Sequence, residues 1–285
     1  MTASAMTQTV TPREIVNPDA KPEAKKDDWK SFGWFLIKLV LVVLIFRTLI
    51  FTSFNIPSES MMPRLLVGDY LFAAKWPYGY SRNSLPFDLD VGDGRLLASL
   101  PERGDIAIFK HPIDNTDYIK RVIGLPGDTV QMIDGQLHLN GEAVPRERVE
   151  DLVVPTDAVK GCGVGRSRFT VRLEDSSFAC SFPQYRETLP NGVTYNTLDL
   201  GDVSVDNTAP ITVPAAHLFM MGDNRDNSQD SRRPAVSNGW VGMVPDENLV
   251  GRASFMYFST DGSASWFNPI SWFTAVRWDR MGRGI

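Results

Sequence analysis

The chain contains one long apolar run, which reads Phe32-Gly-Trp-Phe-Leu-Ile-Lys-Leu-Val-Leu-Val-Val-Leu-Ile-Phe-Arg-Thr-Leu-Ile50. A helix of this length can cross the hydrocarbon core of a bilayer. The two cations in the run, Lys38 and Arg47, lie toward its ends, where their charged groups can reach the membrane surface. The run therefore predicts a transmembrane anchor at residues 31–52.

A cleavable secretory signal is the alternative to an anchor. Such a signal has a short n-region and a small-residue cleavage site. Here residues 1–30 precede the run, and residues 51–57 contain no A-x-A sequence. These features favour an uncleaved anchor.

The cations around the run predict its orientation. Four lysines lie in residues 1–30, whereas Arg64 is the only Lys or Arg in the 20 residues after the run. The positive-inside rule places the N-terminus in the cytoplasm, and the composition of residues 1–30 predicts a disordered tail. The rest of the chain is then expected on the periplasmic or exoplasmic side of the inner (plasma) membrane. In an oxidising compartment Cys162 and Cys180 can pair, and two free buried thiols are the alternative.

Composition excludes several classes of protein. The 285 residues carry 29 Lys and Arg against 34 Asp and Glu, a net charge of −5, so no basic field is available to bind nucleic acid. The apolar share of 43% and charged share of 22% are ordinary globular values. The three histidines are far apart and form no metal-binding pair, so no metal site is expected.

Beyond the anchor, short apolar stretches alternate with turn signals, which predicts a mainly β structure. Asp134-Gly135 and Asn140-Gly141 bracket one stretch as hairpin turns, and Asn191-Gly192 marks another turn. No window of helical periodicity is sustained there. The stretches expected to form strands are residues 70–74, 106–109, 118–123, 129–133, 136–139, 169–173 and 217–221.

Residues 129–213 are more polar and richer in turn signals than their flanks. They predict an inserted β subdomain within a β core formed by residues 53–128 and 214–285. At the C-terminus, aromatic and cationic residues gather in a segment that suits either a membrane interface or packing on the core. These residues are Trp266, Phe267, Trp272, Phe273, Arg277, Trp278 and Arg280.

Three segments contain residues that could do chemistry. The first is Ser58-Glu-Ser-Met-Met-Pro63, the second is Asp117-Tyr-Ile-Lys-Arg-Val-Ile123, and the third is Gly222-Asp-Asn-Arg-Asp-Asn-Ser-Gln-Asp-Ser-Arg232. Taken singly, they are typical of a turn, a strand with a surface lysine and a solvated loop. In combination and in this order, they resemble the type I signal peptidases, membrane-anchored serine proteases with a Ser/Lys dyad. The other matching pieces are Gly68-Asp-Tyr70, Arg103-Gly-Asp105, Gly124-Leu-Pro-Gly-Asp128 and Gly251-Arg-Ala253.

The resemblance implies a role for each matching position. Ser60 would be the nucleophile and Lys120 the general base, with Ser58 as a side-chain oxyanion donor. Ser228 would orient Lys120. Four residues would shape the loop that carries Ser228: Asp223, Arg225, Asp230 and Arg232. Glu59 and Arg64 depart from the commonest family pattern beside the site.

Physical reasoning on the same residues agrees with these roles. A serine hydroxyl needs a nearby base, and because these segments contain no histidine, the Lys120 amine is the available candidate. The amine must be neutral to act, so burial away from carboxylates must lower its pKa from about 10.4. Met61, Ile119, Val122 and Ile123 are expected to supply the apolar surroundings.

The substrate implied by the resemblance is a secretory signal peptide with small residues at −3 and −1. Ser60 follows Phe51 by nine residues, at most about 30 Å of extended chain, which places the site near the membrane surface. A substrate strand could add beside the segments that hold Ser60 and Lys120. The positions that match shallow substrate pockets are Phe54, Ile56, Pro57, Met61, Leu65, Tyr118 and Ile119.

The sequence thus predicts one N-terminal transmembrane helix followed by an antiparallel β catalytic domain with an inserted β subdomain. The predicted function is membrane-bound serine endopeptidase cleavage of signal peptides from exported preproteins. The expected partners are these peptides and the lipid bilayer, with no nucleic acid, no cofactor and a functional monomer. Two alternatives remain, a peptidase dedicated to one secretion or pilus substrate and a non-catalytic, membrane-tethered β binding module.

Overall fold

The computed structural model describes residues 28–85, 94–156, 161–163, 165–265 and 267–285. The chain divides after Val43 into two compact units. The expected tail at residues 1–30 lies almost wholly outside the described residues, as does Trp266.

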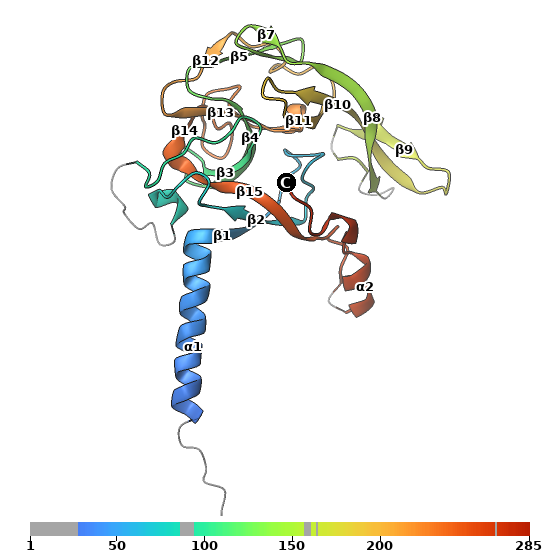
Figure 1. The fold of residues 1–285 in the computed structure, drawn as a ribbon. Helices are drawn as coiled ribbons and strands as arrows, with labels where there is room; N and C mark the ends of the chain where they lie inside the picture. Colours follow the sequence, from blue (N-terminus) through green and yellow to red (C-terminus); the bar gives the residue numbers. More distant parts are fainter. Residues whose placement is uncertain (1–27, 86–93, 157–160, 164, 266) are drawn as a thin grey trace, which may run out of the picture. The chain divides into compact units, whose positions relative to one another are not determined.

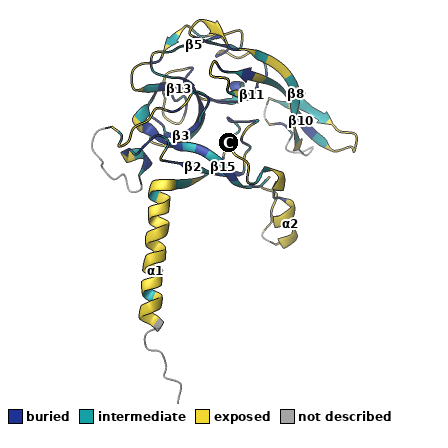
Figure 2. Ribbon diagram, viewed as in Figure 1, coloured by how far each residue is buried: buried dark blue, intermediate teal, exposed yellow. Residues whose placement is uncertain are grey.

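The N-terminal helix is long and apolar enough to cross a membrane. Helix α1 (Asp28–Ile45) continues into a π-helical turn, Phe46–Ile50. Residues 29–50 have a mean hydropathy of 2.2, and their apolar side chains are exposed almost throughout (Figure 2). An apolar helix that buries no face within the protein suits a lipid environment. The helix begins at Asp28, before the anchor of residues 31–52 expected from sequence, and the helical turn ends at Ile50 because Phe51 pairs with Ala74 in a sheet.

The largest sheet has seven antiparallel strands in the order β1-β2-β15-β3-β4-β13-β14 (Figure 1). The second half of β4 is buried on both faces, since Val122 and Ile123 belong to different core clusters. This sheet is therefore covered on both sides where β4 ends. Its strands are β1 (Phe51–Asn55), β2 (Asp69–Ala74), β3 (Ile106–Lys110), β4 (Asp117–Gly124), β13 (His217–Met221), β14 (Val244–Pro245) and β15 (Leu249–Ser259).

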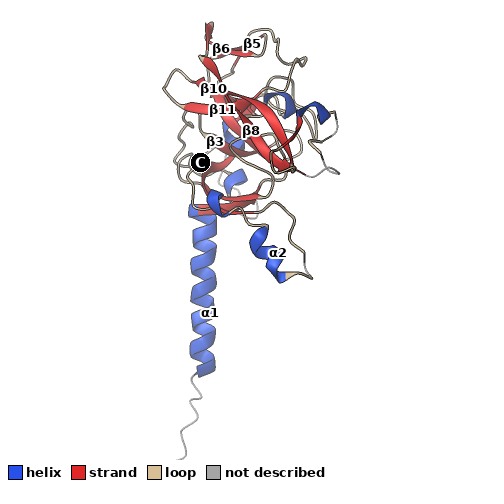
Figure 3. Ribbon diagram, turned by 90° about the vertical axis from the view of Figure 1, so that its right-hand side faces the viewer, coloured by secondary structure: helices blue, strands red, loops and turns tan. Residues whose placement is uncertain are grey.

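Two smaller sheets are built from residues 129–212. One has the order β11-β10-β8 with β9 paired to β10, and the other has the order β12-β5-β6-β7. Figure 3 shows β8, β10 and β11 side by side. The strands are β5 (Thr129–Ile133), β6 (Gln136–Leu139), β7 (Glu142–Ala143), β8 (Arg146–Thr156), β9 (Thr170–Arg172), β10 (Phe178–Thr188), β11 (Thr194–Leu198) and β12 (Ile211–Thr212).

The predicted hairpin turns are confirmed. Asp134 and Gly135 have φ of 46° and 74°, and Asn140 and Gly141 have φ of 55° and 86°. These left-handed conformations are those that two-residue hairpin loops require, which explains the Asp-Gly and Asn-Gly pairs. The expected strands also form, so the predicted fold class, mainly β with one N-terminal helix, is confirmed.

The C-terminal segment combines features of both arrangements expected for it. The guanidinium of Arg280 pairs with Asp69, and that of Arg277 donates to the carbonyls of Val67 and Thr260. The aromatic side chains point outward, with Phe267, Phe273 and Trp278 exposed by 98%, 67% and 61%. Short helices complete the fold: α2 (Pro269–Thr274) and the 3-10 turns Arg82–Ser84, Ser167–Phe169, Arg225–Asn227, Asp246–Asn248 and Trp278–Arg280.

Candidate active site

Ser60 and Lys120 meet in a buried position. The Lys120 Nζ atom lies 2.7 Å from Ser60 Oγ, within hydrogen-bond distance. The two residues are only 7% and 3% exposed. The hydroxyl of Ser58 lies 3.3 Å from that of Ser60, so two hydroxyls and one amine converge at one point.

Ser60 and Lys120 come from separate parts of the large sheet. Ser60 lies in a turn after β1, and Lys120 lies in β4, four strand positions away. In a flat sheet that separation would be about 19 Å. The five residues from Asn55 to Ser60 can span up to about 17 Å when extended, so this segment can carry Ser60 across most of that separation. Lys120 has a fixed place because it pairs with Ala107 of β3.

Burial lowers the pKa of Lys120 from 10.5 to about 8. The carboxylates of Asp230 and Asp223 act against this, because each raises the pKa of the amine. The sequence-based expectation of a site away from carboxylates was thus wrong. The amine is still readily neutralised, because Asp223 pairs with Arg121 and Asp230 pairs with Arg232, which lessens the field of both carboxylates at Lys120.

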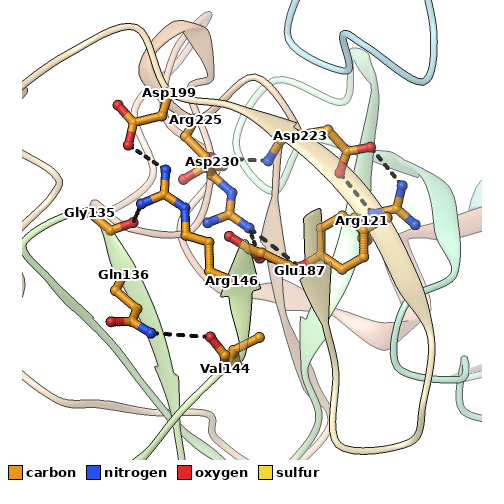
Figure 4. Close-up of polar contacts among 12 residues, drawn as sticks. Arg121, Gly135, Gln136, Val144, Arg146, Glu187, Asp199, Asp223, Arg225 and Asp230 are labelled. Atoms are coloured by element: carbon orange, nitrogen blue, oxygen red, sulfur yellow. Dashed lines mark hydrogen bonds and ion pairs between the residues drawn. The ribbon is translucent and has the colours of Figure 1, made fainter. Parts of the chain in front are cut away.

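Buried ion pairs fix the loop at residues 222–232. Arg121 forms two hydrogen bonds to Asp223, of 2.8 and 2.6 Å, and Arg225 lies 2.5 Å from Glu187 (Figure 4). The loop also reaches the nucleophile, because the Asn224 N–H donates to the Ser60 carbonyl at 3.1 Å. Buried charges that are fully paired resist displacement, since breaking one pair leaves an uncompensated charge.

Gly222 is packed directly between two site residues. A Cβ atom at this position would overlap the hydroxyl of Ser228 and the carbonyl of Ser60. Only a residue without a side chain leaves both in place. Steric exclusion of a side chain therefore explains why glycine occupies the start of the 222–232 segment.

Ser228 lies in the site but not as expected. It is buried and lines the same cleft as Ser60 and Lys120. Its hydroxyl lies near the Asp230 carboxylate, whose pKa it helps to lower, and the expected hydrogen bond to Lys120 is not formed in the described part of the chain. Ser228 therefore shares the cleft with Lys120 but makes no direct hydrogen bond to its amine.

A cleft of about 530 Å³ opens onto the site. Of the expected pocket residues, Pro57, Tyr118 and Ile119 line it. The other four form or border the apolar cluster that includes Leu71 and Val250, and they are Phe54, Ile56, Met61 and Leu65. Sequence reasoning missed part of the cleft wall, which includes Val203, Val205 and Trp240. These come from distant segments, and no motif marks them.

The sequence profile described as "Signal peptidase, peptidase S26" matches residues 29–258. The chain belongs to this signal peptidase family. The match covers the helix, the Ser60 turn, Lys120 and the 222–232 loop, so the predicted resemblance to type I signal peptidases is confirmed. Membership identifies the chain as a serine endopeptidase.

Several curated relatives named signal peptidase I come from Rickettsia. That of Rickettsia bellii strain OSU 85-389 is 37% identical over 90% of this chain and 85% of its own. That of Rickettsia canadensis strain McKiel is 35% identical over 94% and 97%. A solved signal peptidase I from Enterococcus faecalis V583 covers 55% of this chain and 98% of its own at 23% identity, with a TM-score of 0.29, too low to support a conclusion.

Proposed function

We propose that this signal peptidase family member cleaves N-terminal signal peptides from exported preproteins by means of a Ser60/Lys120 dyad. The observation that carries the proposal is the buried Lys120 amine 2.7 Å from the Ser60 hydroxyl. A binding module would need neither group. Among the described residues, no group of three or more histidines, cysteines and carboxylates is placed to hold a metal ion.

The proposed reaction has two halves. Lys120 takes the Ser60 proton as Oγ attacks the scissile carbonyl, and then gives it to the leaving amine as the C–N bond breaks. Water, deprotonated by the same amine, then hydrolyses the acyl-Ser60 ester. The Ser58 hydroxyl and the Ser60 N–H are the proposed donors to the oxyanion in both halves, a contribution of about 3 kcal/mol for each donor.

Substrate choice is proposed to rest on shape. Pro57, Tyr118 and Ile119 line the cleft beside the dyad, while other apolar side chains, among them Met61 and Leu65, fill the core next to it. Such a surface accommodates small side chains at −3 and −1. An extended signal peptide can contact this surface as an added strand, with its backbone supplying affinity and its small side chains supplying specificity.

The proposed setting is the inner (plasma) membrane, with the N-terminus in the cytoplasm and the catalytic domain, acting as a monomer, on the exoplasmic side. The helix of residues 29–50 and the lysines before it support this orientation. We also propose that residues 129–213 are an insert in a catalytic core of residues 53–128 and 214–285. Every strand of the two smaller sheets falls within the insert.

The direct test incubates the purified full-length protein in detergent with a preprotein that carries an A-x-A site, and locates the cut by mass spectrometry. Cleavage after the second alanine by the wild type, and none by Ser60→Ala, is the expected result. Cleavage elsewhere, or equal cleavage by both proteins, would contradict the proposal.

A further inference from the structure

We propose that Arg166 and the Cys162–Cys180 disulfide are positioning elements for Ser60, which act through Glu59. This inference rests on the proposed function. Arg166 belongs to the Arg166 loop, defined as residues 161–163 and 165–169, which precedes β9 in the inserted segment. The nucleophile turn is defined as residues 58–62.

Glu59, between Ser58 and Ser60, connects the nucleophile turn to two other segments, the Arg166 loop and the 222–232 loop. Its carboxylate accepts hydrogen bonds from the guanidinium of Arg166 and from the side-chain amide of Asn227, the latter at 2.9 Å. Its backbone carbonyl accepts a hydrogen bond from the side-chain amide of Asn224 at 3.1 Å. A small residue at position 59 would make neither of the two carboxylate contacts.

The disulfide holds the Arg166 loop to the sheet. Cys162, in the loop, is bonded to Cys180 of β10, and their Cα atoms are 5.5 Å apart. The hydroxyl of Thr156, at the end of β8, donates to the Gly161 carbonyl at 2.7 Å. The loop that presents Arg166 to Glu59 is therefore fixed close to its start.

The same disulfide also contacts the other end of the nucleophile turn. Met62, two residues after Ser60, is buried in a cluster with Cys162, Cys180 and Phe182. The turn is thus held to the inserted sheet by a polar contact before Ser60 and an apolar contact after it. The backbone hydrogen bond from Asn224 to the Ser60 carbonyl holds the same turn to the 222–232 loop, so these two contacts add a separate attachment to the inserted sheet.

The physical consequence concerns the rate of the chemical step. The Ser60 hydroxyl must stay within hydrogen-bond distance of Lys120, and small misplacements of reacting groups reduce rates strongly. Glu59 and Arg166 are partly exposed, by 41% and 22%, so their pair contributes modestly. Loss of the contact should lower kcat about fivefold, with KM changed less than twofold.

The test compares three variants of the full-length protein with an A-x-A preprotein substrate. Arg166→Ala should show the loss of kcat, and Arg166→Lys, which keeps the charge, should recover at least half of it. Arg186→Ala is the matched control, because Arg186 forms an exposed ion pair with Glu147 in the same sheet, away from the cleft. It should cleave as the wild type does.

The disulfide is tested in the same assay. Excess dithiothreitol supplies two electrons and two protons, so that the disulfide becomes two thiols while the reagent becomes its cyclic disulfide. Reduction of the wild type, or Cys162→Ala with Cys180→Ala, should lower kcat about as much as Arg166→Ala does. Reduction of Arg166→Ala should lower kcat no further, because the two thiols stay apolar and keep their packing with Met62, and two elements that act through the remaining Glu59 contact are not additive.

If the wild type cleaves and Arg166→Ala has the same kcat, the inference is overturned and the proposed function stays intact. If reduction lowers kcat by the same factor in the wild type and in Arg166→Ala, the inference is overturned as well. A wild type that does not cleave would refute the proposed function instead. If Arg166→Ala does not fold, the kcat of folded Glu59→Ala decides, with a loss of about fivefold expected and an unchanged value contradicting the inference.

Discussion

The pH dependence of cleavage follows from the burial of Lys120. Its pKa of about 8 means that about one tenth of the amine is neutral at pH 7 and about nine tenths at pH 9. Because only the neutral amine can accept the Ser60 proton, kcat/KM should rise about tenfold between these values and level off above pH 9. A lysine with an ordinary pKa of 10.5 would instead gain about a hundredfold and still be rising at pH 9.

The variant Asp230→Asn tests the direction in which neighbouring charges shift the pKa of Lys120. The carboxylate of Asp230 raises the pKa of Lys120, and Arg232 lowers it. Asp230→Asn removes the carboxylate and leaves the Arg232 guanidinium unpaired. The midpoint of the pH profile of kcat/KM should therefore move to lower pH by about one unit. Asp175→Asn is the control, because Asp175 is exposed and its hydrogen bonds are to Ser177.

The assay is the initial rate on a soluble peptide with an A-x-A site, measured from pH 7 to 10.5. The range begins at pH 7 because burial raises the pKa of Asp226, which lines the cleft, to about 6. A flat profile, a midpoint above pH 10, or a shift to higher pH in Asp230→Asn would refute the reasoning.

Two further variants test the geometry around the dyad. Ser58→Ala removes the hydroxyl 3.3 Å from Ser60 Oγ, so kcat should fall on the order of 10²-fold with KM little changed; a kcat equal to wild type would exclude an oxyanion role. Gly222→Ala places a methyl group against Ser228 and the Ser60 carbonyl, so it should lower kcat on the order of 10²-fold and destabilise the fold by about 1–3 kcal/mol. Gly284→Ala, with open space at its Cβ, is the control, and equal effects of both substitutions in thermal unfolding would contradict the steric argument.

Local signals made much of the fold predictable. Asp134-Gly135 could be read as a turn because its chemistry is contained in two adjacent residues. Strand β8 was missed because it alternates charged and apolar residues irregularly and is only partly buried, so it lacks a clear period of two. Strand β10 was missed because Pro183 interrupts it, where the register with β8 also shifts.

The site was predictable only in part, for a different reason. Ser60 and Lys120 lie in recognisable segments, whereas Arg166 and Glu59 are 107 positions apart and meet only in the folded chain. Glu187 and Arg225 are 38 positions apart and likewise meet only in the folded chain. Contacts between distant polar residues leave no periodic pattern in a sequence. The contact of Arg166 with Glu59 in the nucleophile turn therefore could not be predicted.

Activation of Ser60 by the Lys120 amine can be tested by replacing the amine alone. Lys120→Met keeps the length and apolar stem of the side chain but removes the base. Single-turnover cleavage of an A-x-A preprotein should be slower than wild type by a factor on the order of 10⁴, while thermal unfolding shows a folded protein. Cleavage within tenfold of the wild-type rate by folded Lys120→Met would contradict the account.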